Sequence, residues 1–147
     1  MCEAYDTLTV INVVEHVLNS YQHFETIYFA LKEGGQLVFN DRAWPSYSPV
    51  STHDLHHQDW AYHPIRPKAV IFQHFLSFFE PTHCEYYYTN YKITEKYSLQ
   101  SISYYLIGKK RPREEVWKEL YSVGQHKTFP EFMCKQVTLE ELSARTY

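Results

Sequence analysis

The chain has 147 residues, 18% of them aromatic, and a formal net charge of −3. This length fits one domain, the aromatic content is too high for a disordered segment, and the small charge does not indicate a nucleic-acid or anionic membrane partner. The four glycines do not form G-x-G-x-x-G or G-x-x-x-x-G-K-[ST], which excludes a Rossmann fingerprint and a P-loop.

Targeting signals and cysteine usage indicate the cellular compartment. No apolar run approaches the roughly 20 residues needed to span a bilayer, and the start MCEAYDTLTV lacks the basic region of a signal peptide. Cys2, Cys84 and Cys134 are odd in number and widely spaced. We therefore expect a cytoplasmic protein with reduced thiols and no membrane partner.

The first forty residues indicate a strand, a helix and a second strand. Residues 5–14 form a β-branched run that is typical of a buried parallel strand. Asn19 is an expected N-cap, and apolar residues then recur at helical spacing. Gly34-Gly35 is expected to end this helix, and residues 36–40 form the second strand. Such a connection favours parallel pairing of the two strands.

The rest of the chain predicts a long loop, a helix and a hairpin. Residues 41–65 are polar and aromatic, and a loop of this length is usually functional. Residues 69–79 are apolar nearly all round and predict a buried helix. Two tyrosine-rich runs, 83–92 and 101–109, alternate with period 2 and predict an antiparallel pair. We therefore divide the chain into a domain over 1–111 and a helical C-terminal extension over 112–147.

Two stretches, YDTLTVINVVEHVLN and FETIYFALKEGGQLVFNDR, resemble the second half of a class I S-adenosylmethionine-dependent methyltransferase domain of the type 11/12 kind. That family has an aspartate beside an aromatic residue, an apolar strand, N-V-L-E-H, a helix, L-K-x-G-G and a strand. The resemblance runs from Tyr5 to about Lys109. It implies an α/β fold, a partial Rossmann-like methyltransferase sheet with β-α-β followed by a helix and an antiparallel β-hairpin. The implied spatial order of the four strands is first, second, fourth, third.

The chain departs from this family in its donor-binding half. The glycine-rich loop and the acidic residue that holds the ribose are absent from the sequence. We therefore expect a fragment of a longer methyltransferase, a truncated gene product, or a degenerate half-domain. The resemblance implies methyl transfer from S-adenosylmethionine to a small-molecule acceptor, with the chain alone inactive. The alternative is a non-catalytic interaction module that forms a homodimer through the exposed sheet edge.

The resemblance also implies the residues of the site. Asn12 and Val13 would contact the cofactor, and Glu15 and His16 would be catalytic, with His16 as the general base because histidine titrates near neutral pH. The alternative is that these residues have no functional role and only satisfy or cap the local backbone. Some related O-methyltransferases hold a divalent metal with E-x-x-E-H, whereas here an amide, Asn12, stands in the first position.

The acceptor would be bound by residues after the second strand. The resemblance implies Asp41, Arg42, Trp44 and Trp60 for this role, whereas a local ion pair would be the bland alternative for the first two. The same loop contains several histidines, which leave open a zinc site and a metal-dependent hydrolase. We nevertheless expect no bound metal, because no cysteine stands nearby. The histidines are His53, His56, His57 and His63.

Overall fold

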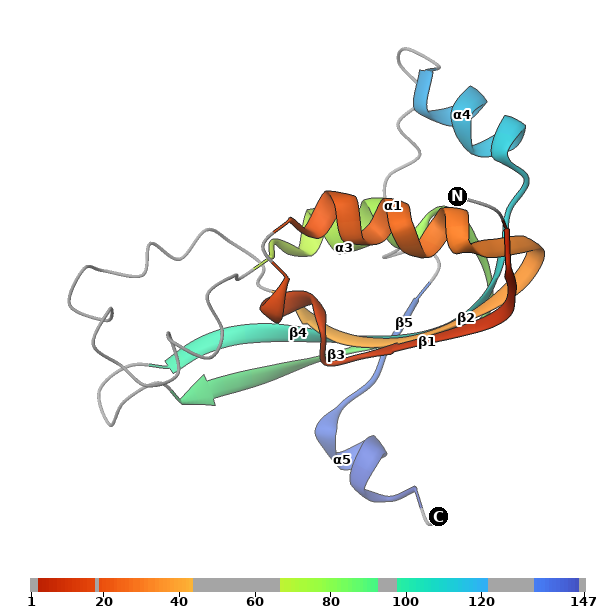
Figure 1. Cartoon of the computed structure of the whole chain (residues 1–147). Helices are drawn as coiled ribbons and strands as arrows, with labels where there is room; N and C mark the ends of the chain where they lie inside the picture. Colours follow the sequence, from red (N-terminus) through yellow and green to blue (C-terminus); the bar gives the residue numbers. More distant parts are fainter. Residues whose placement is uncertain (1–2, 18, 44–66, 93–97, 122–133, 146–147) are drawn as a thin grey trace.

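The computed structural model describes residues 3–17, 19–43, 67–92, 98–121 and 134–145. Within these ranges one five-stranded sheet is present, with helices packed against it (Figure 1). The strands are β1 (Tyr5–Ile11), β2 (Leu31–Ala43), β3 (Phe79–Lys92), β4 (Ser98–Lys110) and β5 (Lys135–Gln136). The helices are η1 (Val14–His16), which is a 3-10 turn, α1 (Ser20–Ala30), α3 (Ala69–Leu76), α4 (Arg113–Tyr121) and α5 (Leu139–Ser143).

The sheet has the order β1-β2-β4-β3-β5. β1 pairs in parallel with β2, β4 is antiparallel to both β2 and β3, and β5 is parallel to β3. This confirms the predicted α/β class and the predicted order of the first four strands. The register places Ile11 opposite Asn40, and Ala43 opposite Ile102. The last strand of the hairpin is therefore inserted beside the parallel pair.

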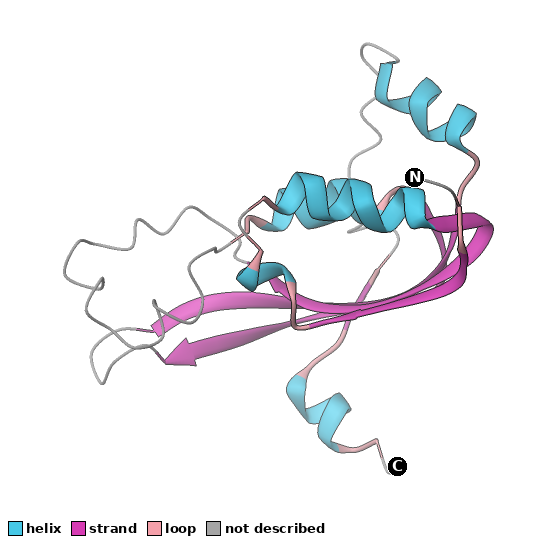
Figure 2. Ribbon diagram, in the orientation of Figure 1, coloured by secondary structure: helices cyan, strands magenta, loops and turns pink. Residues whose placement is uncertain are grey.

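The core lies between the sheet and the helices α1 and α3, which run along one of its faces (Figure 2). Phe24 of α1 stacks on Phe75 of α3 with ring centroids 4.2 Å apart, and Phe39 of β2 meets Phe72 edge-on at 5.4 Å. All four rings are buried. The apolar pattern of the second helix is thus confirmed, although the helix ends at Leu76 because Phe79 already pairs with Lys110 in the sheet.

The structure corrects the prediction of where the first helix ends. The helix α1 is capped by Asn19 as predicted, but it ends at Ala30, so the glycine pair does not end it. Gly34 has a φ of +68°, and a Cβ on Gly35 would lie 2.8 Å from the carbonyl oxygen of Lys32. The glycines therefore serve the close approach at the start of β2 rather than the helix end.

The first strand is an exposed edge rather than a buried strand. Among the described strands β1 is bonded to β2 alone, and its residues are mostly exposed, including Tyr5 at 54% and Ile11 at 49%. Val10 is the residue of β1 that is buried in the core. The β-branched pattern correctly predicted a parallel strand, but it did not show that only one edge of this strand is paired.

The C-terminal extension joins the sheet at the edge opposite to β1. A disulfide links Cys84 of β3 to Cys134, just before β5, with Cα atoms 4.4 Å apart. The expectation of reduced thiols is therefore wrong for this pair, because the parallel pairing of β5 with β3 brings the two cysteines together. Arg145, after α5, donates two hydrogen bonds to Glu85 of β3, at 2.8 and 2.7 Å. The Arg145 guanidinium is the main reason that the pKa of Glu85 is lowered.

Candidate functional site

The carboxyl ends of β1 and β2 lie at the same end of the sheet, because the two strands are parallel. The backbone amide of Asn12 donates a hydrogen bond of 2.9 Å to the carbonyl of Asn40, so the segment after β1 begins beside the last residues of β2, which continues to Ala43. In open α/β sheets, ligands bind just outside the carboxyl ends of the strands. We therefore treat the segment from Asn12 to His16, together with the end of β2, as the candidate site.

Asn12 has an unusual backbone conformation. Its φ is +51°, in the left-handed region. Among the described residues other than glycine, Asn12 alone has a positive φ. Asparagine tolerates this region better than most residues, and such positions concentrate at functional sites. The conformation ends β1 at Ile11 and leaves Asn12 exposed at the strand end. Its role as a cofactor contact stays a prediction.

Asp41 holds the turn that follows β1. It is 1% exposed. Its Oδ2 accepts hydrogen bonds from the amides of Val13 at 2.8 Å and Val14 at 2.9 Å, and its Oδ1 accepts one from the amide of Arg42 at 2.8 Å. The carboxylate thus satisfies two amides at the start of η1 that have no partner within that turn. Both of its oxygens are engaged, and its role in binding an acceptor stays a prediction.

Glu15 and His16 lie in η1 itself. Glu15 is buried, whereas His16 is exposed and donates its amide hydrogen to the carbonyl of Val13 at 2.9 Å. The structure therefore places the predicted base, His16, on the surface beside the strand ends, where a bound acceptor could reach it. The carboxylate of Glu15 is largely withdrawn from solvent. Their catalytic roles stay predictions.

Sequence analysis missed His23 of α1. Its Nε2 is buried and has no hydrogen-bond partner among the described residues. Burial lowers the pKa of His23, and the nearby negative charge of Asp41 opposes this shift. The sequence carried a signal for it, because His23 follows Ser20 by three residues and precedes Ile27 by four, on the buried stripe of the helix.

The remaining predicted site residues are only partly covered by the structure. Arg42 is half-buried in β2, opposite Ser103 of β4. Trp44, Trp60 and the four histidines of the long loop lie outside the described residues. The structure thus brings together residues 12–16 with Asp41 and Arg42, and it does not place the rest. Within the described part of the chain, no three metal-ligating side chains are grouped as a metal site would require.

The described residues fit only part of an S-adenosylmethionine site. Asn12 stands exposed at the strand end, but the two carboxylates of the candidate site, Glu15 and Asp41, are both buried. That of Asp41 is also bound to backbone amides. No described residue at this end of the sheet replaces the acidic group that holds the ribose in the family. The arrangement therefore supplies strand-end contacts and no complete donor pocket, and we derive no reaction step through the cofactor.

Comparison with solved structures identifies the fold. A protein from Bacillus halodurans, classed provisionally as a methyltransferase, superposes with a TM-score of 0.56 at 15% identity, over 76% of this chain and 67% of that protein. A second, from a study of the conversion of a disulfide bond into a thioacetal group in echinomycin biosynthesis, has 10% identity and a TM-score of 0.41, over 85% of this chain and 56% of that one. The latter score is too low to carry an argument.

The chain therefore has a class I methyltransferase-like α/β fold, and it spans about two thirds or less of the length of these two proteins. No protein-family model matches the sequence. No curated protein sequence matches it either. In the described part of the chain, none of the helices is both long enough and apolar enough to cross a membrane.

Proposed function

We propose that this chain contributes the acceptor side of an S-adenosylmethionine-dependent methyltransferase that acts on a small molecule. The observation that carries the proposal is the sheet order β1-β2-β4-β3, in which an antiparallel strand is inserted beside a parallel pair. The structure that superposes with a TM-score of 0.56 belongs to a protein classed as a methyltransferase. In this proposal Asn12 and Val13 lie against the donor, and Asp41, Arg42, Trp44 and Trp60 border the acceptor.

Methyl transfer from a sulfonium is an in-line displacement, and its catalyst mainly positions donor and acceptor and excludes water. A general base is needed only when the acceptor carries a proton on its nucleophile. His16 is our candidate for that role because it is exposed beside the strand ends. The buried Glu15 stands next to it in the same turn.

The 147 residues alone are expected to bind S-adenosylmethionine only weakly. The reason is that the sequence contains no glycine-rich loop and no acidic residue for the ribose. Isothermal calorimetry of S-adenosylmethionine against the purified chain should show no micromolar binding, with circular dichroism confirming that the chain is folded. A micromolar dissociation constant would show that the chain is a sufficient donor site.

The sequence encoded upstream of Met1 tests the parent enzyme directly. Two βα units of about 30 residues each place a D-x-G-x-G motif roughly 60 to 80 residues earlier. In a longer chain with this motif, Asn12→Ala should weaken binding of S-adenosylmethionine, and His16→Ala should slow transfer without affecting binding. If upstream sequence has no such motif, the proposal of a fragment fails.

The second candidate is a non-catalytic interaction module, and the exposed edge of β1 favours it. Among the described strands β1 is paired on one side only, beside the exposed Tyr5 and Ile11. Such edges pair with other strands unless they are blocked. Under this candidate the chain forms a homodimer through β1, and Thr9→Lys, at an exposed position, converts it to a monomer. Light scattering after size exclusion measures both species, and a monomeric native chain contradicts the candidate.

A further inference from the structure

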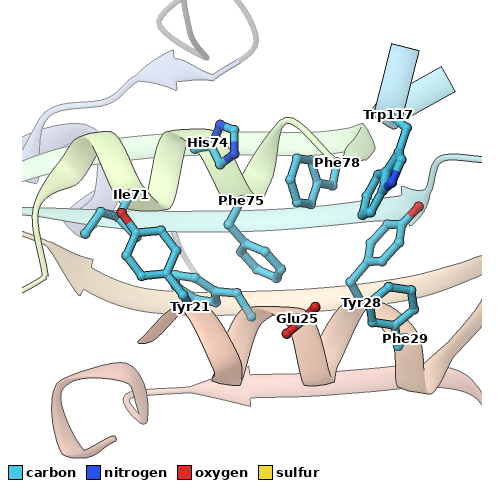
Figure 3. A pocket seen from close by; sticks show the side chains of 10 residues that line it. Tyr21, Glu25, Tyr28, Phe29, Ile71, His74, Phe75, Phe78 and Trp117 are labelled. Atoms are coloured by element: carbon cyan, nitrogen blue, oxygen red, sulfur yellow. The ribbon is translucent and has the colours of Figure 1, made fainter. Parts of the chain in front are cut away.

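A second site lies in the helical layer, away from the strand ends. A pocket of about 290 Å³ opens between α1 and α3 and is bounded at one end by α4 (Figure 3). Rings dominate its lining, and none of its lining residues belongs to the candidate site described above. They include Tyr21, Tyr28 and Phe29 from α1, Phe75 and Phe78 from α3, and Trp117 from α4.

One acidic side chain lies among these rings. Glu25 of α1 is the acidic residue among the described residues that line the pocket. Figure 3 shows it pointing from α1 toward the space between Tyr21 and Tyr28, beneath Phe75. It is exposed to solvent, and a glutamate carries one formal negative charge. The pocket thus combines apolar walls with a single negative charge.

Aromatic faces attract cations, because the ring quadrupole is negative above the plane. Rings of this pocket already do so within the chain. The guanidinium of Arg113 lies 5.5 Å from the centroid of Phe29 and 5.2 Å from that of Trp117. The ammonium of Lys110 lies 4.5 Å from the centroid of Tyr28. Neither Arg113 nor Lys110 is among the described residues that line the pocket. These two cations contact the rings of Tyr28, Phe29 and Trp117 and not those of Tyr21 or Phe75.

Besides Glu25, the titratable side chains of the described lining are Tyr21, Tyr28 and His74. Burial lowers the pKa of His74, which favours its uncharged imidazole. The volume of about 290 Å³ is at the lower end of the range for small-molecule sites. Such a pocket accepts a compact ligand rather than a peptide or a nucleotide.

We propose that this pocket binds a small organic ammonium ion, with its charge against Glu25 and its alkyl groups against the rings of Tyr21 and Phe75. An apolar pocket alone would take a neutral hydrocarbon equally well. The carboxylate of Glu25 favours a positively charged ligand instead. The proposal is independent of methyl transfer, because it involves other residues on another part of the fold.

Choline and its uncharged isostere, 3,3-dimethyl-1-butanol, test this proposal without any activity measurement. Binding to the native chain is followed by NMR chemical shifts of the aromatic side chains. Choline is expected to bind at least about tenfold more tightly than the isostere, since shape and apolar area are the same and only the charge differs. Equal binding of the two would show an unselective apolar pocket and would overturn the proposal.

Two variants locate the bound cation. Glu25→Gln should remove most of the preference for choline while leaving the isostere unaffected. Tyr21→Ala, at a side chain that is 66% exposed, should weaken the binding of choline several-fold. Glu140→Gln, which changes another exposed glutamate, on α5, is the matched control and should change nothing. No binding of choline up to about 10 mM, or an unchanged preference in Glu25→Gln, would refute the proposal.

Discussion

Replacing Asp41 with alanine is expected to lower the free energy of unfolding by about 3–5 kcal/mol. The carboxylate is buried and accepts hydrogen bonds from the amides of Val13, Val14 and Arg42. Its removal leaves these donors without their acceptor next to the core, and unsatisfied buried donors are costly. Urea denaturation followed by circular dichroism measures the change.

Two variants separate the role of this carboxylate from a general loss of charge. Asp41→Asn keeps the size and one acceptor oxygen, so it should cost about half as much as alanine. Asp6→Asn is the matched control, because the Asp6 side chain is 84% exposed and its ion pair with Lys32 lies on the surface. It should change stability by less than about 0.5 kcal/mol. If Asp41→Ala costs less than about 1 kcal/mol, the carboxylate does not hold this turn.

Replacing Cys134 with serine is expected to lower stability by about 4 kcal/mol under oxidising conditions. The disulfide joins Cys84 to a position 50 residues later, and closing a loop of that length reduces the entropy of the unfolded chain considerably. Because the bond also attaches β5 to β3, the variant should lose protection of the C-terminal segment as well. Thermal unfolding and amide hydrogen exchange measure the two effects.

Reducing agent provides the control for this prediction. It should lower the stability of the native chain to that of Cys134→Ser and leave the variant itself unchanged. The same experiment bears on the compartment, since a reducing cytoplasm would keep both thiols free. Equal stability of the native and variant chains under oxidising conditions would show that the disulfide contributes nothing to the fold.

Sequence predicted the parts of the fold that depend on local signals. The N-cap at Asn19, the helical stripe that follows and the parallel strand after it are all encoded within about forty residues. The insertion of β4 between β2 and β3 came from the resemblance alone, because alternation in a strand does not specify its neighbour. The same limit explains why the exposed edge of β1 was taken for a buried strand.

Contacts between distant residues could not be predicted. Asp41 reaches Val13 across 28 positions, and the disulfide spans 50. Neither leaves a periodic pattern in the sequence, and both depend on the strand order. His23 was not singled out for a related reason. Its position in the sequence does not show that its ring nitrogen is buried without a partner, or that Asp41 of β2 lies near it. The candidate site at the strand ends came from the resemblance. The structure shows the geometry of its described residues, and their functional role stays a prediction.

The pairing of β3 with β4 has a consequence for the order in which the sheet assembles. These two strands pair from Phe79 opposite Lys110 to Lys92 opposite Ser98, and the last pair is only six positions apart in the sequence. Short loops close at the least entropic cost, and local contacts form fastest. Among the described strands β1 pairs only with β2, which follows it after α1, so this pairing requires the intervening helix to be in place. The strand that carries the candidate site is thus expected to form late and open first, as is common for regions that bind ligands.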